Sequence, residues 1–183
     1  MATKTLTTVE EFEQLPREEA RRFELDEEEL VEVSRAIFDH NVARDRFAET
    51  LRRFARERRL GVVVAEQEFR LSARTVRRPD VAFVSATKAA AIQGQKRIQH
   101  LVPDLVVEVA SDSDSFTGLM RKVRQYLDNG VRMVLVVNLP LAETTVFHAD
   151  GRIVLLRAAD TLSAEDVLPG FSCGVAQFFD PNY

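Results

Sequence analysis

Two periodicities in the hydrophobic pattern divide the chain into expected helices and strands. Apolar positions at three- and four-residue steps predict a long amphipathic helix over 37–59 and a second helix over 115–129. Five side chains at helical spacing are expected to share one face of the first helix: His40, Arg44, Phe47, Leu51 and Phe54. Gly61 is expected to end the first helix and Gly130 the second. A shorter helix over 9–19 is predicted from the capping-box spacing that begins at Thr8, with Pro16 as a candidate break.

Alternating or continuous β-branched and apolar runs predict the strands. These runs are 22–26 and 29–33, which read as a hairpin, then 62–72, 79–84, 105–110, 131–137, 144–148 and 152–157. The segment 86–98 is polar and alanine-rich, and we expect a loop with about one helical turn there. Strand 105–110, helix 115–129 and strand 131–137 together predict a right-handed βαβ crossover. The expected fold class is α/β (α+β), a central mixed sheet flanked by helices with an N-terminal helix and hairpin, in a single domain over 1–183.

Composition narrows the class of protein. The chain has 183 residues and one cysteine, Cys173, so an internal disulfide and a cysteine-based zinc cluster are excluded. Its apolar runs fall short of the roughly 18 residues that a membrane span needs, and its N-terminus does not resemble a signal peptide. We therefore expect a cytoplasmic protein that does not associate with membranes.

Charge is unevenly distributed along the chain. The formal net charge is −4, but residues 1–34 hold eleven acids against four bases, which leaves the remainder at +3. Between Arg70 and Arg97 there are seven bases and a single acid, Asp80. A basic field around one carboxylate would suit an anionic polymer, because phosphate contacts dominate nucleic-acid affinity. A solvated surface explains the same run equally well.

Three titratable residues stand out as candidates for chemistry. Glu108 lies within a strand-like apolar run, where a buried carboxylate costs several kcal/mol unless a cation or a salt bridge compensates it. Asp80 follows a proline, which by itself is typical of a turn or cap, but the strand after it could place it beside Glu108. Lys122 lies on the border of a helical apolar stripe together with Tyr126, and a solvent-facing lysine is the alternative.

Other catalytic arrangements find no support in the sequence. No serine has a nucleophile-elbow context, the histidines number only three, and no glycine-rich phosphate loop occurs, so a nucleotide cofactor is not expected. His40 falls on the inward face of its helix, where a satisfied core or rim histidine is the simpler interpretation. Glu24 lies in the hairpin, where a plain surface residue is the simpler interpretation.

Three segments in order give the chain a family resemblance. They are Arg78-Pro79-Asp80-Val81, then the run Pro-Asp-Leu-Val-Val-Glu-Val-Ala-Ser over 103–111, then Lys122 with Tyr126 and Asn-Gly-Val over 129–131. They resemble the Uma-type family of predicted restriction endonucleases, within the PD-(D/E)XK nuclease superfamily. The likeness extends to the hairpin around Glu24, to His40 and to the ending 166–171, so it spans nearly the whole chain.

The resemblance implies the restriction-endonuclease-like fold and a divalent cation, Mg²⁺ or Mn²⁺, as cofactor. It assigns the metal ligands to Asp80, Glu108 and the backbone carbonyl of Val109. The superfamily's lysine stands two residues after the glutamate, where this chain has Ala110. In the Uma-type family that lysine has moved to the following helix, which matches Lys122.

The same resemblance supplies the remaining site residues and the expected function. Glu24 and His40 correspond to polar positions near the family's site; Glu24 joins Asp80, Glu108 and Lys122 as an expected catalytic residue that supports the metal or the water, and His40 and Tyr126 are accessory candidates. The expected function is metal-dependent hydrolysis of phosphodiester bonds in DNA, by a homodimer. Three arginines are expected to contact phosphates: Arg74, Arg77 and Arg78. The alternative is a catalytically silent module that keeps the nuclease fold and binds DNA or a protein partner.

Overall fold

A six-stranded mixed sheet forms the centre of the computed structural model, which describes residues 7–33, 37–92, 94, 96–111 and 114–179. Its strand order is β11-β10-β9-β8-β6-β3. The strands are β3 (Gly61–Ala65), β6 (Val81–Ser85), β8 (Leu105–Val109), β9 (Met133–Asn138), β10 (Glu143–His148) and β11 (Ile153–Arg157). Only β8 and β9 run parallel, and the other neighbours in this sheet are antiparallel.

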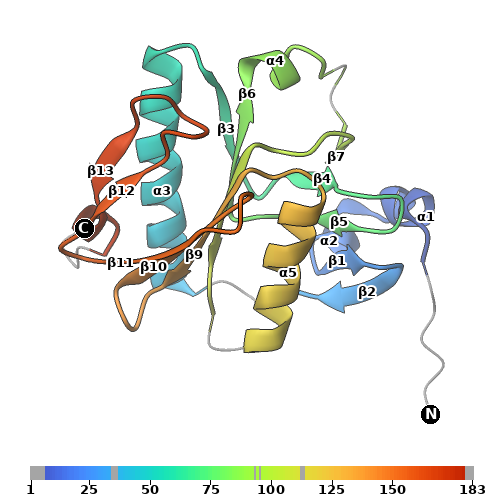
Figure 1. Ribbon diagram of the computed structural model, residues 1–183. Helices are drawn as coiled ribbons and strands as arrows, with labels where there is room; N and C mark the ends of the chain where they lie inside the picture. Colours follow the sequence, from blue (N-terminus) through green and yellow to red (C-terminus); the bar gives the residue numbers. More distant parts are fainter. Residues whose placement is uncertain (1–6, 34–36, 93, 95, 112–113, 180–183) are drawn as a thin grey trace.

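Helices cover both faces of this sheet, as Figure 1 shows. Helix α3 (Phe38–Glu57) packs on one face and α5 (Phe116–Asp128) on the other. Alternate residues of a strand point to opposite faces, so Val107 joins the core under α3 while Val106 joins the core under α5. Burial on both faces explains why β8 and β9 read as continuous apolar runs and not as alternating ones.

The predicted βαβ unit is present. Strand β8 pairs in parallel with β9, and α5 connects them. The side chain of Ser115 caps the helix by accepting a hydrogen bond from the amide of Gly118. The side of α5 that faces the sheet differs from the expectation. Val123 and Tyr126 are the buried residues of this helix, so Tyr126 lies within the buried stripe and not on its border. This rotation turns the Tyr126 hydroxyl toward β8.

A second, five-stranded sheet was not foreseen from the sequence. Its order is β2-β1-β5-β4-β7, with β1 (Phe23–Asp26), β2 (Glu29–Glu32), β4 (Glu68–Arg70), β5 (Val76–Arg77) and β7 (Ile98–Gln99). The predicted hairpin is β1 and β2. A single strand over 62–72 is wrong, because the chain leaves the central sheet after Ala65 and turns at Glu66, whose φ of 52° is left-handed. It then enters the second sheet as β4.

The N-terminal segment consists of two short helices, α1 (Val9–Gln14) and α2 (Arg17–Ala20). The capping box between Thr8 and Glu11 forms as predicted. Pro16 breaks the expected single helix and serves as the N-cap residue of α2, where its missing N–H costs nothing. The break gives α2 its own direction.

The C-terminal elements pack on α3, whereas the helical turn that follows β6 lies against β3 and β6. The short helix α4 (Ala86–Ala89) is the expected single turn, and β12 (Thr161–Ser163), β13 (Ser172–Gly174) and the 3₁₀ helix η1 (Val175–Phe178) lie toward the C-terminus. The rings of Phe47 and Phe178 stack at 3.6 Å. Helix α3 ends at Glu57, so Gly61 opens β3 and does not end the helix; a Cβ there would lie 2.1 Å from the Val84 carbonyl oxygen. In the described part of the chain, no helix is long and apolar enough to cross a membrane.

Candidate active site

Asp80 and Glu108 meet at the end of an antiparallel strand pair. In the β6–β8 register Val81 faces Val107, and continuing it by one residue puts Asp80 opposite Glu108. Directly opposed residues of such a pair project to the same side, within about 5 Å at their Cβ atoms. The backbone amide of Val109 donates a 2.7 Å hydrogen bond to Asp80 Oδ2, which fixes the aspartate beside β8. The structure thus brings the two predicted carboxylates together.

Glu108 is buried, at 6% exposure, beneath α5. The Tyr126 hydroxyl donates a 2.6 Å hydrogen bond to its Oε1. Burial raises the pKa of the Glu108 carboxyl to about 7, against the effect of Lys122, and the charges of Asp80 and Glu24 add to the rise. Burial, together with the charges of Glu108 and Glu24, raises the pKa of Tyr126, so the phenol remains a donor.

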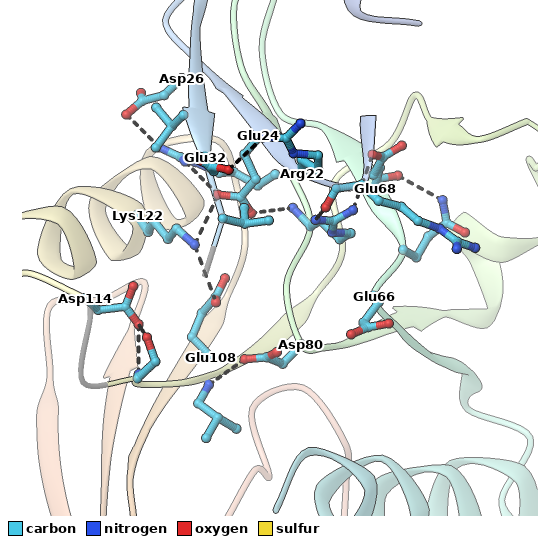
Figure 2. Close-up of a pocket in the computed structure, with 18 of the residues that line it drawn as sticks. Arg22, Glu24, Asp26, Glu32, Glu66, Glu68, Asp80, Glu108, Asp114 and Lys122 are labelled. Carbon is cyan, nitrogen blue, oxygen red and sulfur yellow. Dashed lines mark hydrogen bonds and ion pairs between the residues drawn. The ribbon is translucent and has the colours of Figure 1, made fainter. Parts of the chain in front are cut away.

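Lys122 lies between two buried carboxylates, as Figure 2 shows. Its Nζ is 3.1 Å from Glu24 Oε2 and 3.9 Å from Glu108 Oε2. Burial disfavours the ammonium, but Glu108 and then Glu24 outweigh that effect and raise the pKa of Lys122. The sequence left open whether this lysine faces solvent; the fold points it into the site.

Glu24 comes from β1 of the second sheet and is 2% exposed, so it is not the plain surface residue that its hairpin position suggested. Its Oε2 lies 2.9 Å from Arg77, and its Oε1 accepts a 2.9 Å hydrogen bond from the Arg78 amide. Burial opposes its ionisation, but Lys122 and Arg77 outweigh burial and lower the pKa of Glu24. The N-terminal hairpin thus contributes a fixed negative charge to the site.

Arg77 holds Glu24 in position through buried ion pairs and hydrogen bonds. It is 2% exposed and, besides Glu24, pairs with Asp26 at 3.0 Å and donates a 3.0 Å hydrogen bond from Nε to Gln125. Gln125 also donates to Asp26 at 2.7 Å, which joins α5 to the second sheet. No local pattern in the sequence marks Arg77, Asp26 or Gln125 as partners, because they lie on three separate elements.

His40 approaches Asp80 from α3. Its Nε2 lies 3.4 Å from Asp80 Oδ2. Burial disfavours the imidazolium, but Asp80 and the Val109 backbone outweigh it and raise the pKa of His40. Within the described residues its Nδ1 is buried without a hydrogen-bond partner, so the ring is not the fully satisfied core histidine of the simpler interpretation. His40 therefore adds a titratable group at the Asp80 side of the site.

These residues line a cavity of about 1000 Å³ between the two sheets and α5. Figure 2 looks into it, with Lys122 on one side and Glu68 on the other. The three arginines that are predicted to contact phosphates differ in how they lie relative to this cavity. Arg77 and Arg78 both line the cavity, but Arg77 is 2% exposed, and its guanidinium pairs with Glu24 and Asp26 and donates to Gln125. Arg74 is not in the lining and pairs with Glu27 and Glu28 on the hairpin.

The donor set fits a hard divalent cation. Asp80 and Glu108 supply carboxylate oxygens, the type of ligand that Mg²⁺ prefers. Glu24 lines the same cavity, and one ammonium, that of Lys122, is shared between the buried carboxylates of Glu24 and Glu108, so a divalent ion would neutralise further negative charge here. Over the described ranges, no three His, Cys, Asp or Glu side chains are grouped to hold a metal by themselves. A site here therefore needs a further oxygen, such as the Val109 carbonyl.

The arrangement of a mixed sheet between two helices, with acidic residues from neighbouring strands at one end, defines the class of restriction-endonuclease-like folds. The model of the Uma2 family, described as "Putative restriction endonuclease", matches residues 9–176, and the chain belongs to that family. No curated protein matches it. A crystal structure of a "putative nuclease belonging to DUF820" from Anabaena variabilis ATCC 29413 is similar, with a TM-score of 0.84 and 15% identity over 94% of this chain and 97% of the other. That likeness supports the fold.

Proposed function

We propose that this protein is a metal-dependent endonuclease that hydrolyses phosphodiester bonds in DNA. The observation that carries the proposal is the opposition of Asp80 and Glu108 at the strand ends, with the Lys122 ammonium 3.9 Å from Glu108. Family membership supports the nuclease class. The acids could hold a cation against a phosphate, and the lysine could offset the charge that develops on the phosphate during attack.

Asp80, Glu108 and the Val109 carbonyl would hold Mg²⁺ or Mn²⁺. When bound, the ion supplies Lewis-acid polarisation of the phosphate and lowers the pKa of a bound water. Tyr126 holds one oxygen of Glu108 and leaves the other directed at the Lys122 side. The hydrogen bond from the Val109 amide orients Asp80 in the same way.

Lys122 contributes a positive charge whose position is set by Glu24. Glu24 is in turn held by Arg77 and the Arg78 amide, so we assign it a positioning role and not one of direct contact with the phosphate. His40, beside Asp80, is placed to exchange a proton with water at that side of the site. Homodimer formation and a cytoplasmic location remain predictions from the sequence and the family resemblance.

Incubation of the protein with supercoiled plasmid and Mg²⁺ tests the proposal. We expect nicked or linear DNA with the wild-type protein, and a loss of roughly 100-fold or more with Asp80→Asn or Lys122→Ala, the range typical of removing one charge-stabilising group. Glu66→Gln is the matched control, because Glu66 lines the same cavity but pairs with Arg44 away from the carboxylate pair. Cleavage that survives both site variants would point to a contaminating nuclease. Absence of cleavage with retained DNA binding would favour the catalytically silent module.

A further inference from the structure

The cations that line the cavity fall into two groups. Most have a carboxylate partner: Arg22 pairs with Glu32 at the surface, Arg77 with Glu24 and Asp26, Arg78 and Arg97 with Glu68, and Lys122 with Glu24. Arg17, Arg21 and Lys96 are different. They are exposed, they line the cavity, and among the residues that the structure describes none of their side chains has a carboxylate within ion-pair distance. These three side chains are called the basic rim below.

Local structure places two members of the basic rim on one face. Pro16 starts α2 in a new direction, and the four-residue spacing of Arg17 and Arg21 puts them on the same side of that helical turn. That side faces the cavity, whereas the intervening Glu18 and Glu19 are exposed and outside its lining. Around α2, the two acids thus lie outside the cavity lining while the two arginines are part of it.

Two contacts hold the basic rim against the rest of the molecule. Arg78 donates a 2.6 Å hydrogen bond to the backbone carbonyl of Arg21, which fixes the end of α2 beside β5. Arg97 donates to the backbone carbonyl of Phe12 and lies 5.0 Å over the Phe12 ring, which fixes the segment bearing Lys96 against α1. The three cations thus stand on supported backbone at the same cavity that holds Asp80 and Glu108.

We propose that the basic rim binds phosphates of the DNA backbone on either side of the bond to be cut. The inference rests on the proposed function for the identity of the polyanion. The buried carboxylates of Glu24 and Glu108 and the three exposed, unpaired cations line the same cavity, an arrangement that suits a chain of phosphates of which one reaches the metal ligands. Such contacts position the strand and carry no base preference. They add to the predicted set Arg74, Arg77 and Arg78, of which Arg77 and Arg78 line the cavity but pair with acids there.

The salt dependence of DNA binding tests the basic rim independently of cleavage. The probe is a fluorescein-labelled 20-base-pair duplex, titrated by anisotropy in EDTA and again in Ca²⁺, over 0.05 to 0.3 M salt. The variant Arg17→Gln/Arg21→Gln/Lys96→Gln should give a plot of log K against log salt that is shallower by about 2 to 3, and roughly 100-fold weaker binding at 0.1 M salt, because each phosphate contact contributes about 0.9 to the slope. Arg17→Lys/Arg21→Lys/Lys96→Arg should keep the wild-type slope.

The control variant is Arg53→Gln/Arg56→Gln/Arg59→Gln, which removes the same charge from exposed positions at and just beyond the end of α3, outside the cavity lining. Three results would contradict DNA binding by the basic rim. They are an unchanged slope in the rim variant, an equal change of slope in the control variant, and no duplex binding by the wild-type protein in either buffer. A different result would contradict the proposed function. A wild-type protein that binds with the expected slope but leaves plasmid intact in Mg²⁺ would contradict catalysis and support the rim.

Discussion

The Lys122 ammonium lies 3.1 Å from the Glu24 carboxylate, although the two residues come from different layers of the molecule. Lys122 projects from α5, which covers the central sheet, and Glu24 from β1 of the second sheet. The contact makes the N-terminal hairpin a structural part of the candidate site. Arg77 reinforces it by pairing with the same oxygen of Glu24 at 2.9 Å.

Divalent ions should stabilise the protein through Asp80 and Glu108. At a metal concentration of roughly 100 times Kd, binding to the folded state adds about 3 kcal/mol, which corresponds to a rise in Tm of about 5 to 10 °C for a chain of this size. Differential scanning fluorimetry with Mg²⁺ and Mn²⁺ measures the shift. Glu108→Gln should abolish it and Glu66→Gln should keep it. A wild-type Tm that does not respond to either ion would contradict the proposed metal site.

Glu108→Gln should also change how stability depends on pH. The folded carboxyl has a pKa of about 7, above its ordinary value of 4.5, so the folded state holds this proton more tightly than the unfolded state does. The contribution of this carboxyl group to the free energy of unfolding is therefore greatest below pH 4.5 and is lost as the pH rises through 7. In EDTA, the variant should therefore be more stable than the wild type at pH 8, by up to about 3 kcal/mol, with the difference vanishing near pH 4.5.

Urea denaturation of both proteins at pH 4.5, 6 and 8 measures this difference. Glutamine keeps an oxygen that accepts from Tyr126, so the comparison isolates the charge. Stability curves that run parallel across the pH range would contradict the assigned burial of Glu108.

Lys122→Gln should separate charge compensation from metal binding. Lys122 is not among the proposed ligands, so the variant should retain the metal-induced rise in Tm. Its plasmid cleavage should fall by roughly 100-fold or more, because the charge developing on the phosphate loses a fixed partner. Loss of both properties together would instead mean that Lys122 acts by holding Glu108 and Glu24 in place.

Arg77→Met should destabilise the fold strongly. The guanidinium is 2% exposed, and its removal leaves Glu24 and Asp26 without their shared partner. Breaking a buried ion pair from one side costs about 3 to 5 kcal/mol. Arg74→Met is the matched control, because Arg74 is half-exposed and pairs with acids on the surface, where pairs contribute about 1 kcal/mol or less. Equal losses in the two variants, measured by urea denaturation, would contradict the bracing role.

The elements that the sequence predicted well are those with a strong local signal. Helix α5 begins at its Ser115 cap and ends just before Gly130, and β8 and β9 are apolar enough to read as buried strands. The run over 62–72 failed because its strand propensity continues through Glu66, and only competition between two sheets splits it. Of the expected site, Asp80, Glu108, Lys122, Glu24 and Tyr126 do line or adjoin one cavity.

The sequence by itself determined which chemical groups are available: a carboxylate in an apolar strand, another beside a proline, and a lysine on the next helix. Tertiary structure decided which of them meet. The β6–β8 register opposes Asp80 and Glu108, the rotation of α5 buries Tyr126, and the second sheet brings Glu24 and Arg77 under Lys122. These are contacts between residues tens of positions apart, so they depend on strand register and helix packing, which local patterns of polarity do not encode. The same physics placed Arg77 in the interior and left Arg17, Arg21 and Lys96 at the cavity rim.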